Sequence, residues 1–203
     1  MLPEITTALP LLGLTAVAAY MLGSVPFGIV MARMFGLGDL RQVGSGNIGA
    51  TNVLSTGNKL AAFLTLLGDA GKGGAAVLLA RAALGEDAAQ LAGFAAFLGH
   101  CFPVFLRFKG GKGVATFLGT LLALSFPIGL AACATWAVIA AVFRISSLAA
   151  LVAAALSPMA ATLLGAPQAM ALCVALAFLI GLRHHENIKR LLKGSEPRIG
   201  KKG

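Results

Sequence analysis

The stretch Leu60-Ala-Ala-Phe-Leu-Thr-Leu-Leu-Gly-Asp69-Ala-Gly-Lys72-Gly-Gly-Ala-Ala-Val-Leu-Leu-Ala80 decides the fold class. It is almost wholly apolar, and it reaches the roughly 20 residues that a helix needs to cross a hydrocarbon core. A charged residue at the centre of such a span costs at least about 2.5 kcal/mol, so Asp69 and Lys72 need an explanation. At a spacing of three they share a helix face, and they either neutralise each other or take a direct part in the function.

Six further apolar segments accompany this one, over residues 8–32, 88–106, 114–126, 128–143, 147–165 and 169–182. Together they predict an all-α polytopic integral membrane protein with about seven transmembrane helices. Segments 114–126 and 128–143 are shorter than a full span, so five spans, with this pair merged or peripheral, is the alternative. The composition agrees, because 58% hydrophobic residues, 11% charged residues and a mean hydropathy of +0.90 do not suit a soluble domain.

The charge distribution predicts how the chain lies in the membrane. If the N-terminus is outside, seven crossings place the 33–59 loop, the 107–113 loop, Arg144 and the C-terminal tail on the cytoplasmic side. Of the sixteen Lys and Arg residues, only Arg81 then lies outside, as the positive-inside rule requires. The N-terminus lacks the basic region of a cleaved signal peptide, so we expect the first helix to be retained. We expect a single domain over 1–203, with a basic cytoplasmic tail over 183–203.

The net charge of +9 does not indicate nucleic acid binding, because the basic residues are not interleaved with aromatic ones and no nucleic-acid motif is present. The cysteines, Cys101, Cys133 and Cys173, lie in apolar surroundings without metal-ligand spacing. They indicate neither a disulfide framework nor a zinc site, and we expect them to be small buried hydrophobic residues.

A first polar, glycine-rich stretch follows Arg41 and reads Gly44-Ser45-Gly46-Asn47-Ile48-Gly49-Ala50-Thr51-Asn52. Successive glycines let several backbone N–H groups converge on an anion, and the Ser, Thr and Asn side chains add donors. The stretch therefore favours a phosphate cradle, and a plain turn at the membrane surface is the alternative.

A second such stretch, Lys109-Gly110-Gly111-Lys112-Gly113, opens the apolar segment at 114 and follows Gly99-His100-Cys101. Helix N-termini attract anions, and two lysines strengthen that tendency. It is not an ATP-binding Walker A loop, because Leu106 and Gly113 occupy positions where that motif requires Gly and Ser or Thr. His100 is either part of the site or a helix-end histidine bonded to a carbonyl.

The last polar stretch is Arg183-His184-His185-Glu186-Asn187. His184 and Asn187 share a helix face and can enter a site together. The neighbouring Lys189, Arg190 and Lys193 are typical of a basic helix end that lies on anionic lipid. With no cysteine near and no second carboxylate at ligand spacing, a metal site is not expected.

Taken in order, these stretches resemble one family closely: the bacterial acyl-phosphate-dependent glycerol-3-phosphate acyltransferases of the PlsY type. The resemblance covers nearly the whole chain. It rests on Gly23-Ser24-Val25-Pro26-Phe27-Gly28, Arg41 with Gly44-Ser45-Gly46-Asn47 and Thr51-Asn52, Asp69 with Lys72-Gly73, Gly99-His100 with Phe102-Pro103, Lys109-Gly110-Gly111-Lys112-Gly113-Val114-Ala115-Thr116, Arg144 with Ser146-Ser147, and His184 with Asn187, Arg190 and Glu196.

The resemblance implies transfer of a fatty acyl group from acyl phosphate to the sn-1 hydroxyl of glycerol 3-phosphate, which gives lysophosphatidate and phosphate. It also implies a seven-helix fold in the bacterial inner membrane with a cytoplasmic active site. The expected partners are the two substrates and membrane lipid, without nucleic acid, metal or cofactor, and we expect a monomer. Acyl phosphate is already activated, so the protein need not supply a nucleophile.

The residues suggest roles in that reaction. We hypothesise that Ser45, Gly46, Asn47 and the Lys109–Gly113 loop hold the phosphates and stabilise charge on the attacked carbonyl, while Arg41, Lys112, His184 and Asn187 position glycerol 3-phosphate. The proton acceptor is His184 or a phosphate oxygen of the donor. The expected catalytic residues are His184, Asn187, Ser45 and Lys112, and the expected substrate-binding residues are Arg41, Gly44, Ser45, Gly46, Asn47, Thr51, Asn52, Lys72, His100, Lys109, Gly110, Gly111, Lys112 and Gly113.

Two other classes of membrane protein fit the sequence less well. Many acyl-CoA-dependent acyltransferases use a His-x4-Asp pair, but here Phe105, Lys189 and Arg190 stand at that spacing from the three histidines. An organic-anion or phosphate transporter also needs cationic loops, but it is expected to place charges near the membrane midplane and often has inverted repeats. The surface clustering of the motifs and the lack of repeats favour the enzyme.

Overall fold

The computed structural model describes residues 3–200, and every regular element in that range is helical. The last three residues of the expected basic tail lie outside the described residues. The α-helices are α1 (Leu9–Gly23), α2 (Phe27–Met34), α3 (Ala50–Ser55), α4 (Lys59–Leu84), α5 (Glu86–Cys101), α6 (Val114–Leu124), α7 (Phe126–Phe143), α8 (Ser146–Leu163), α9 (Met170–Arg183) and α10 (His185–Leu192). Short 3-10 turns are η1 (Leu40–Gln42), η2 (Val104–Leu106) and η3 (Pro167–Ala169).

Five helical segments of the described chain are long and apolar enough to cross a membrane: Leu9–Met34, Lys59–Leu84, Glu86–Leu106, Phe126–Phe143 and Ser146–Leu163. A sixth results if Pro167–Arg183 and His185–Leu192, which are bent by 67° at His184, count as one span. Val114–Leu124 is apolar but shorter. The all-α prediction is confirmed, and helices occupy all seven predicted segments, but seven spans stay a prediction.

The alternative in which segments 114–126 and 128–143 merge does not match the structure. Ser125 alone separates α6 from α7, and it is both the C-cap residue of α6 and the N-cap residue of α7. Its extended backbone reverses the chain, and Pro127 is tolerated because it stands in the first turn of α7. The two helices pack side by side, and Gly129 leaves room for the backbone of Leu122.

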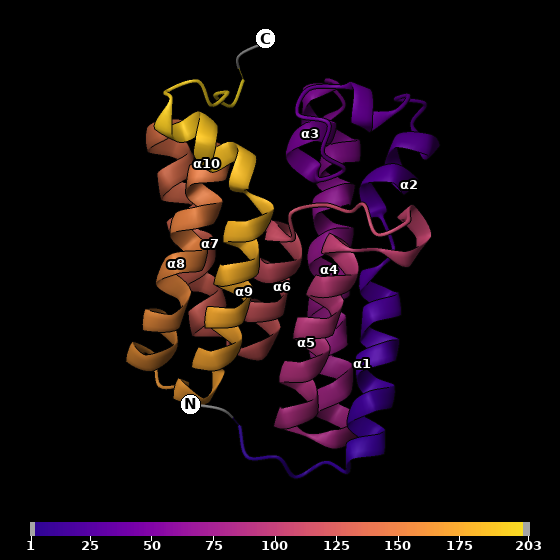
Figure 1. Ribbon diagram of the computed structural model, residues 1–203, viewed down its shortest axis with the longest axis vertical. Helices are drawn as coiled ribbons and strands as arrows, with labels where there is room; N and C mark the ends of the chain where they lie inside the picture. The colour runs from indigo at the N-terminus through magenta and orange to yellow at the C-terminus, as the bar shows by residue number, and fades with distance from the viewer. Residues whose placement is uncertain (1–2, 201–203) are drawn as a thin grey trace.

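Small residues bring the helices of the bundle close together. A Cβ on Gly119 of α6 would collide with the backbone of Ala70 in α4, and one on Gly23 of α1 would collide with Ala96 in α5. Such small-residue contacts are how membrane helices gain packing energy without a hydrophobic driving force. Figure 1 shows the result: α1 to α5 lie on one side, α7 to α10 on the other, and α6 between them.

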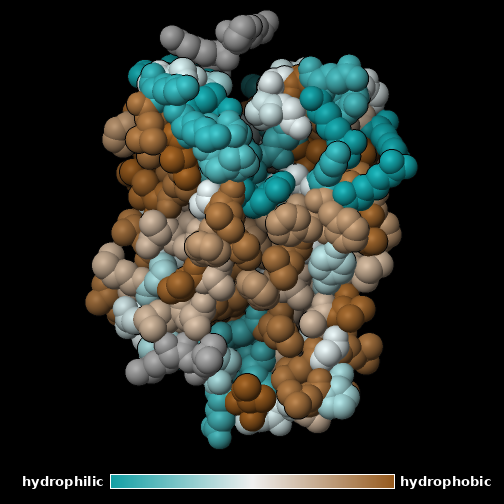
Figure 2. All heavy atoms as spheres, in the orientation of Figure 1, coloured by the Kyte–Doolittle hydropathy of each residue, from teal (hydrophilic) through white to brown (hydrophobic). Residues whose placement is uncertain are grey.

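The two ends of the bundle differ in polarity. At one end lie α2, α3 and α10, where hydrophilic residues gather above an apolar belt (Figures 1 and 2). At the opposite end, the carboxylate of Asp87 accepts hydrogen bonds from the backbone N–H groups of Thr6 and Thr7 at 2.9 and 2.8 Å. Arg81 is also there, bound to Glu86 at 2.9 Å. The predicted polar stretches therefore do share one end of the bundle. The side of the membrane that this end faces stays a prediction.

Candidate functional site

The first polar stretch forms a loop between η1 and α3 that is organised by one amide. Asn52 is 4% exposed, and its Oδ1 accepts from the Ser45 N–H at 2.8 Å. Its Nδ2 donates to the carbonyl oxygens of Leu40 and Asn47 at 2.8 and 2.6 Å. Asn52, predicted to bind substrate, has both amide hydrogens engaged, so it supports the loop. Ser45 and Arg41 are exposed.

Two glycines of this loop need their lack of a side chain. Gly44 and Gly46 have φ values of 55° and 68°, in the left-handed region that favours glycine. A Cβ on Gly44 would also lie 2.5 Å from Oδ1 of Asn52. At the start of α3, Thr51 Oγ1 is 3.3 Å from Ser146 Oγ at the start of α8, a contact that links the two sides of the bundle.

The second polar stretch, residues 109–113, forms a loop that we call the glycine loop. Its backbone is held against the end of α5, because Gly110 donates to the carbonyl of Cys101 at 3.2 Å and Gly111 to that of His100 at 3.1 Å. From the end of α9, Arg183 donates to the carbonyl oxygens of Gly110 and Gly111 at 2.9 and 3.0 Å. Its guanidinium also lies 5.2 Å from the ring centroid of Phe102. The loop is thus fixed from both sides of the bundle.

Gly113 ends the glycine loop and begins α6. Its φ of 82° is left-handed, and a Cβ there would collide with the ring of Phe97. The N-terminus of α6, with its unpaired N–H groups and positive dipole end, therefore follows directly from the loop.

Lys112 turns toward the C-terminal part of the chain. Its Nζ donates to Asn187 Oδ1 at 2.6 Å, and Asn187 Nδ2 donates to Glu196 Oε1 at 2.5 Å. Glu196 also accepts from Ser147 Oγ at 2.6 Å and from Arg190 Nε at 2.7 Å. The carboxylate of Glu196 thus links α8 to α10 and, through Asn187, both to the glycine loop.

The electrostatics of this network follow from its partial burial. Burial lowers the pKa of Lys112 below its ordinary value, an effect that Glu196 opposes and that Arg190 and Arg183 reinforce. Burial alone would raise the pKa of Glu196, but hydrogen bonds from Ser147, Asn187 and Arg190 hold it below its ordinary value. Glu196 is therefore ionised at neutral pH.

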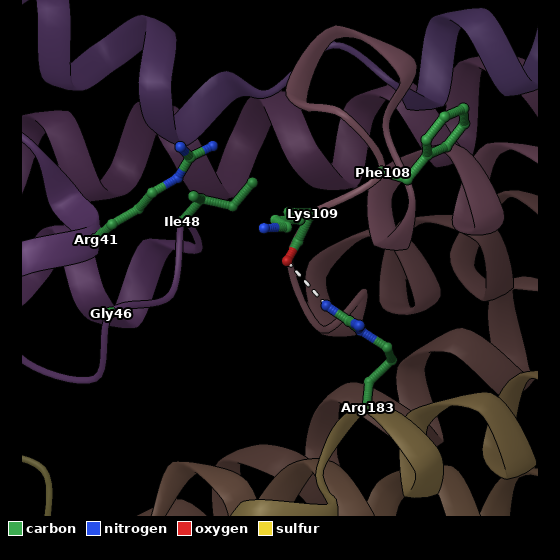
Figure 3. A pocket seen from close by; sticks show the side chains of 7 residues that line it. Arg41, Gly46, Ile48, Phe108, Lys109 and Arg183 are labelled. Atoms are coloured by element: carbon green, nitrogen blue, oxygen red, sulfur yellow. Dashed lines mark hydrogen bonds between the residues drawn. The ribbon is translucent and has the colours of Figure 1, made fainter.

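A pocket of about 460 Å³ opens at the polar end between these segments. Arg41 lines it from η1, and Gly46 and Ile48 line it from the loop that follows. The rest of the lining comes from the glycine loop and the residue before it (Phe108, Lys109 and Gly110) and from Arg183 at the end of α9. In Figure 3, Arg41 and Lys109 face each other across Ile48, while Arg183 reaches up to the backbone of the glycine loop. Three cations and no carboxylate line the pocket, so it is suited to an anion.

His184 lies at the bend between α9 and α10 and is 3% exposed. Its Nδ1 is 2.8 Å from the carbonyl oxygen of Ile180. A carbonyl can only accept, so Nδ1 carries the hydrogen and Nε2 is left as an acceptor. This tautomer suits the predicted proton acceptor.

Lys72 and His100, both predicted to bind substrate, lie below the loops in the helix bundle. Lys72 Nζ is 2.8 Å from Asp69 Oδ1, and His100 Nδ1 is 3.4 Å from the same oxygen. Asp69, Lys72 and His100 are 2%, 3% and 5% exposed. For Asp69 and Lys72 this arrangement favours the structural alternative, mutual neutralisation.

The sequence-based list of site residues omitted Arg183, which lines the pocket and binds the glycine loop. A basic residue at the end of an apolar helix is usually a membrane-surface anchor, and its partners are 72 and 73 residues away. The only sequence signal was its place beside His184. Among residues 3–200, no three His, Cys, Asp or Glu side chains gather as metal ligands would.

The fold and the site define a class: an integral membrane protein with an anion-binding pocket where its polar loops meet at one end of the bundle. Similarity to known proteins narrows this class to one family. The family model described as glycerol-3-phosphate acyltransferase matches residues 13–194. A glycerol-3-phosphate acyltransferase of Jannaschia sp. is 78% identical over 99% of both chains. That of Dinoroseobacter shibae is 62% identical, again over 99% of both.

The solved structures agree. A crystal structure of PlsY (YgiH), an integral membrane glycerol 3-phosphate acyltransferase in its glycerol 3-phosphate form, is 40% identical with a TM-score of 0.88, over 93% of this chain and 96% of that one. Its lysphosphatidic acid form is 37% identical with a TM-score of 0.85, over 93% and 95%. The chain belongs to the glycerol-3-phosphate acyltransferase family and is an integral membrane enzyme of the PlsY type.

Proposed function

We propose that the enzyme transfers a fatty acyl group from acyl phosphate to the sn-1 hydroxyl of glycerol 3-phosphate, giving lysophosphatidate and inorganic phosphate. The observation that carries the proposal is the pocket lined by Arg41, Lys109 and Arg183 together with glycine backbone. Clustered cations and backbone donors are what a phosphate group requires. An apolar belt lies directly below, where a fatty acyl chain can stay in the membrane while its phosphate end reaches the pocket (Figure 2).

Acyl phosphate suits this site as the donor because both substrates then carry a phosphate. The pocket offers one group of cations, and Lys112, held by Asn187, offers another on the same loop. The geometry refines the roles expected from the sequence: Arg41 lines the pocket together with Lys109, whereas Lys112 and Asn187 are linked in a separate network. We assign the pocket and Ser45 to one phosphate, and Lys112 with the N-terminus of α6 to the other.

The reaction needs no covalent intermediate on the protein. The sn-1 hydroxyl oxygen attacks the acyl carbonyl carbon, the bond from that carbon to the phosphate oxygen breaks, and phosphate leaves with the electron pair. Donors fixed by the glycine loop stabilise the negative charge on the carbonyl oxygen as it develops. The hydroxyl proton passes to Nε2 of His184 or to an oxygen of the donor phosphate.

We further propose that the polar end faces the cytoplasm of a bacterial inner membrane and that the enzyme acts as a monomer. The described Lys and Arg residues lie mostly at the polar end or in the tail, while Arg81 lies at the opposite end with Glu86. The positive-inside rule then orients the bundle with its site on the cytoplasmic side.

The donor is tested with the purified protein in detergent, offered palmitoyl phosphate or palmitoyl-CoA, each with and without glycerol 3-phosphate. We expect lysophosphatidate and phosphate in equal amounts from palmitoyl phosphate, only when glycerol 3-phosphate is present. Product from the thioester alone would contradict the proposal and assign the enzyme to an acyl-CoA-dependent class.

Two variants test the roles within the site. Lys112→Ala is expected to lose most turnover, and full turnover would remove Lys112 from the phosphate-binding group. His184→Gln is expected to lower kcat and change its pH profile if Nε2 accepts the proton. An unchanged profile with most of kcat retained would assign proton transfer to the donor phosphate.

A further inference from the structure

A buried polar group lies beneath the glycine loop and has no part in the mechanism above. Asp69 and Lys72 come from α4, and His100 comes from the last turn of α5. Asp69 Oδ1 is 2.8 Å from Lys72 Nζ and 3.4 Å from His100 Nδ1. Burying charged groups in a membrane helix costs free energy, and here their mutual contacts offset part of that cost. We therefore expect the three side chains to serve the fold or the site.

Lys72 extends this group to a third element. Its Nζ donates to the carbonyl oxygen of Val25 at 2.8 Å, where the chain breaks between α1 and α2. It also lies 5.8 Å from the ring centroid of Phe27. Lys72 therefore ties Asp69 to the α1–α2 break, and the side of His100 that carries Nδ1 faces this buried ion pair.

The other side of the His100 ring faces the glycine loop. A Cβ built on Gly111 would collide with Nε2 of His100, and Cε1 and Cδ2 would be its next neighbours at 3.0 and 3.1 Å. The Gly111 N–H also donates to the backbone carbonyl of His100 at 3.1 Å. Gly111 thus lies directly against the imidazole ring, with no room for a side chain.

We propose that His100 is a positioning residue: its ring, which lies between the Asp69–Lys72 pair and the glycine loop, sets where Gly111 lies, and through Gly111 it aims Lys112 and the N-terminus of α6 at the substrate phosphate. The inference rests on the proposed role of the glycine loop in holding phosphate. In this role His100 acts through Gly111 and not by touching substrate: Asp69 lies on the Nδ1 side of the ring, and Gly111 packs against the ring.

A steric exchange tests this contact. Gly111→Ala forces the loop off the ring, and a displacement of about 1 Å at a catalytic site can lower kcat/KM by about 100-fold. Removing the ring opens that space, so the double variant His100→Ala/Gly111→Ala is expected to regain about 10-fold over Gly111→Ala, a non-additive result typical of touching residues. Additive losses in the double variant would overturn the proposal and return His100 to direct substrate binding.

Gly110→Ala is the matched control. A Cβ on Gly110 would meet backbone oxygens of His100 and Cys101 and the ring of Pro103, none of which His100→Ala removes. Gly110→Ala is therefore expected to lose activity whether or not His100 is present. Rescue of Gly110→Ala as well as Gly111→Ala would show general loosening of the loop and would overturn the specific contact.

His100→Asn separates positioning from simple support of the fold, since the amide keeps a donor near Asp69 but gives Gly111 no ring to lie on. We expect KM for a phosphate-bearing substrate to rise about 10-fold, as for a displaced binding group, with an unchanged melting temperature. A lower melting temperature with unchanged KM would mean a structural role only. All variants are compared using whichever acyl donor the wild-type enzyme accepts, so failure of the proposed donor leaves this test intact.

Discussion

Arg183 connects the glycine loop to α9 through a geometry that only a guanidinium can supply. Its two donors bind the carbonyl oxygens of Gly110 and Gly111 from one planar group, whereas the ammonium of lysine is a point charge. Losing one charge-assisted hydrogen bond costs about 1.5–3 kcal/mol. Arg183→Lys should therefore lower kcat/KM by about 10-fold or more, measured by lysophosphatidate formation. Arg198→Lys, an exposed arginine outside the site, is the control. Equal activity of both variants would remove Arg183 from the site.

Lys112 predicts how activity depends on pH. Its pKa is lowered by burial, so its ammonium loses the proton at a pH where an ordinary lysine is still charged. Phosphate binding should accordingly weaken on the alkaline side, with KM rising as pH increases. Lys112→Arg keeps its charge throughout this range and should move the alkaline limb to higher pH, even with a lower maximal rate. Lys59→Arg, at an exposed lysine, should leave the limb in place; an unmoved limb in Lys112→Arg would contradict the assignment.

At the scale of the helices, the apolar pattern predicted positions well because each run ends at Gly, Pro or charged residues. It did not predict that 8–32 divides into α1 and α2, although Pro26 lacks the N–H that a continuous helix requires. The apolar pattern could not predict which side chains contact one another. Glu196 accepts hydrogen bonds from Ser147, Asn187 and Arg190. These side chains meet where the chain bends by 67° between α9 and α10. The sequence also does not reveal that the amide of Asn52, predicted to bind substrate, is engaged within its own loop.

The close packing of α4 and α6 gives a prediction on stability. Gly119 lies against the backbone of Ala70, which cannot move aside as a flexible side chain would. Overpacking of this kind costs about 1–3 kcal/mol, so Gly119→Ala should lower the melting temperature measured in detergent. Gly13 in α1 has no neighbour within 4 Å of a Cβ, so Gly13→Ala should not. Equal melting temperatures for the two variants would contradict the packing account.

At the scale of the whole molecule, the proposed orientation is accessible to labelling of intact cells. Ala83 lies near the end of α4 beside Arg81, and Ser195 lies in the C-terminal segment, and both are exposed. Ala83→Cys should react with a membrane-impermeant thiol reagent from outside, and Ser195→Cys only after the cells are opened. Cys101 and Cys173 are buried as expected, but Cys133 is only half-buried, so the wild-type protein treated in the same way gives the natural background. The reverse pattern would place the site outside.

Arg41 offers the most direct test of whether the pocket at the polar end holds a substrate phosphate. Arg41 lines this pocket, whereas Arg33 lines only a neighbouring one. Steady-state kinetics of Arg41→Gln and Arg33→Gln, with both substrates varied, distinguish them. We predict that kcat/KM for at least one phosphate-bearing substrate falls about 10-fold or more in Arg41→Gln, as for a lost charged hydrogen bond, and stays near the wild-type value in Arg33→Gln. Wild-type kinetics for Arg41→Gln would contradict it.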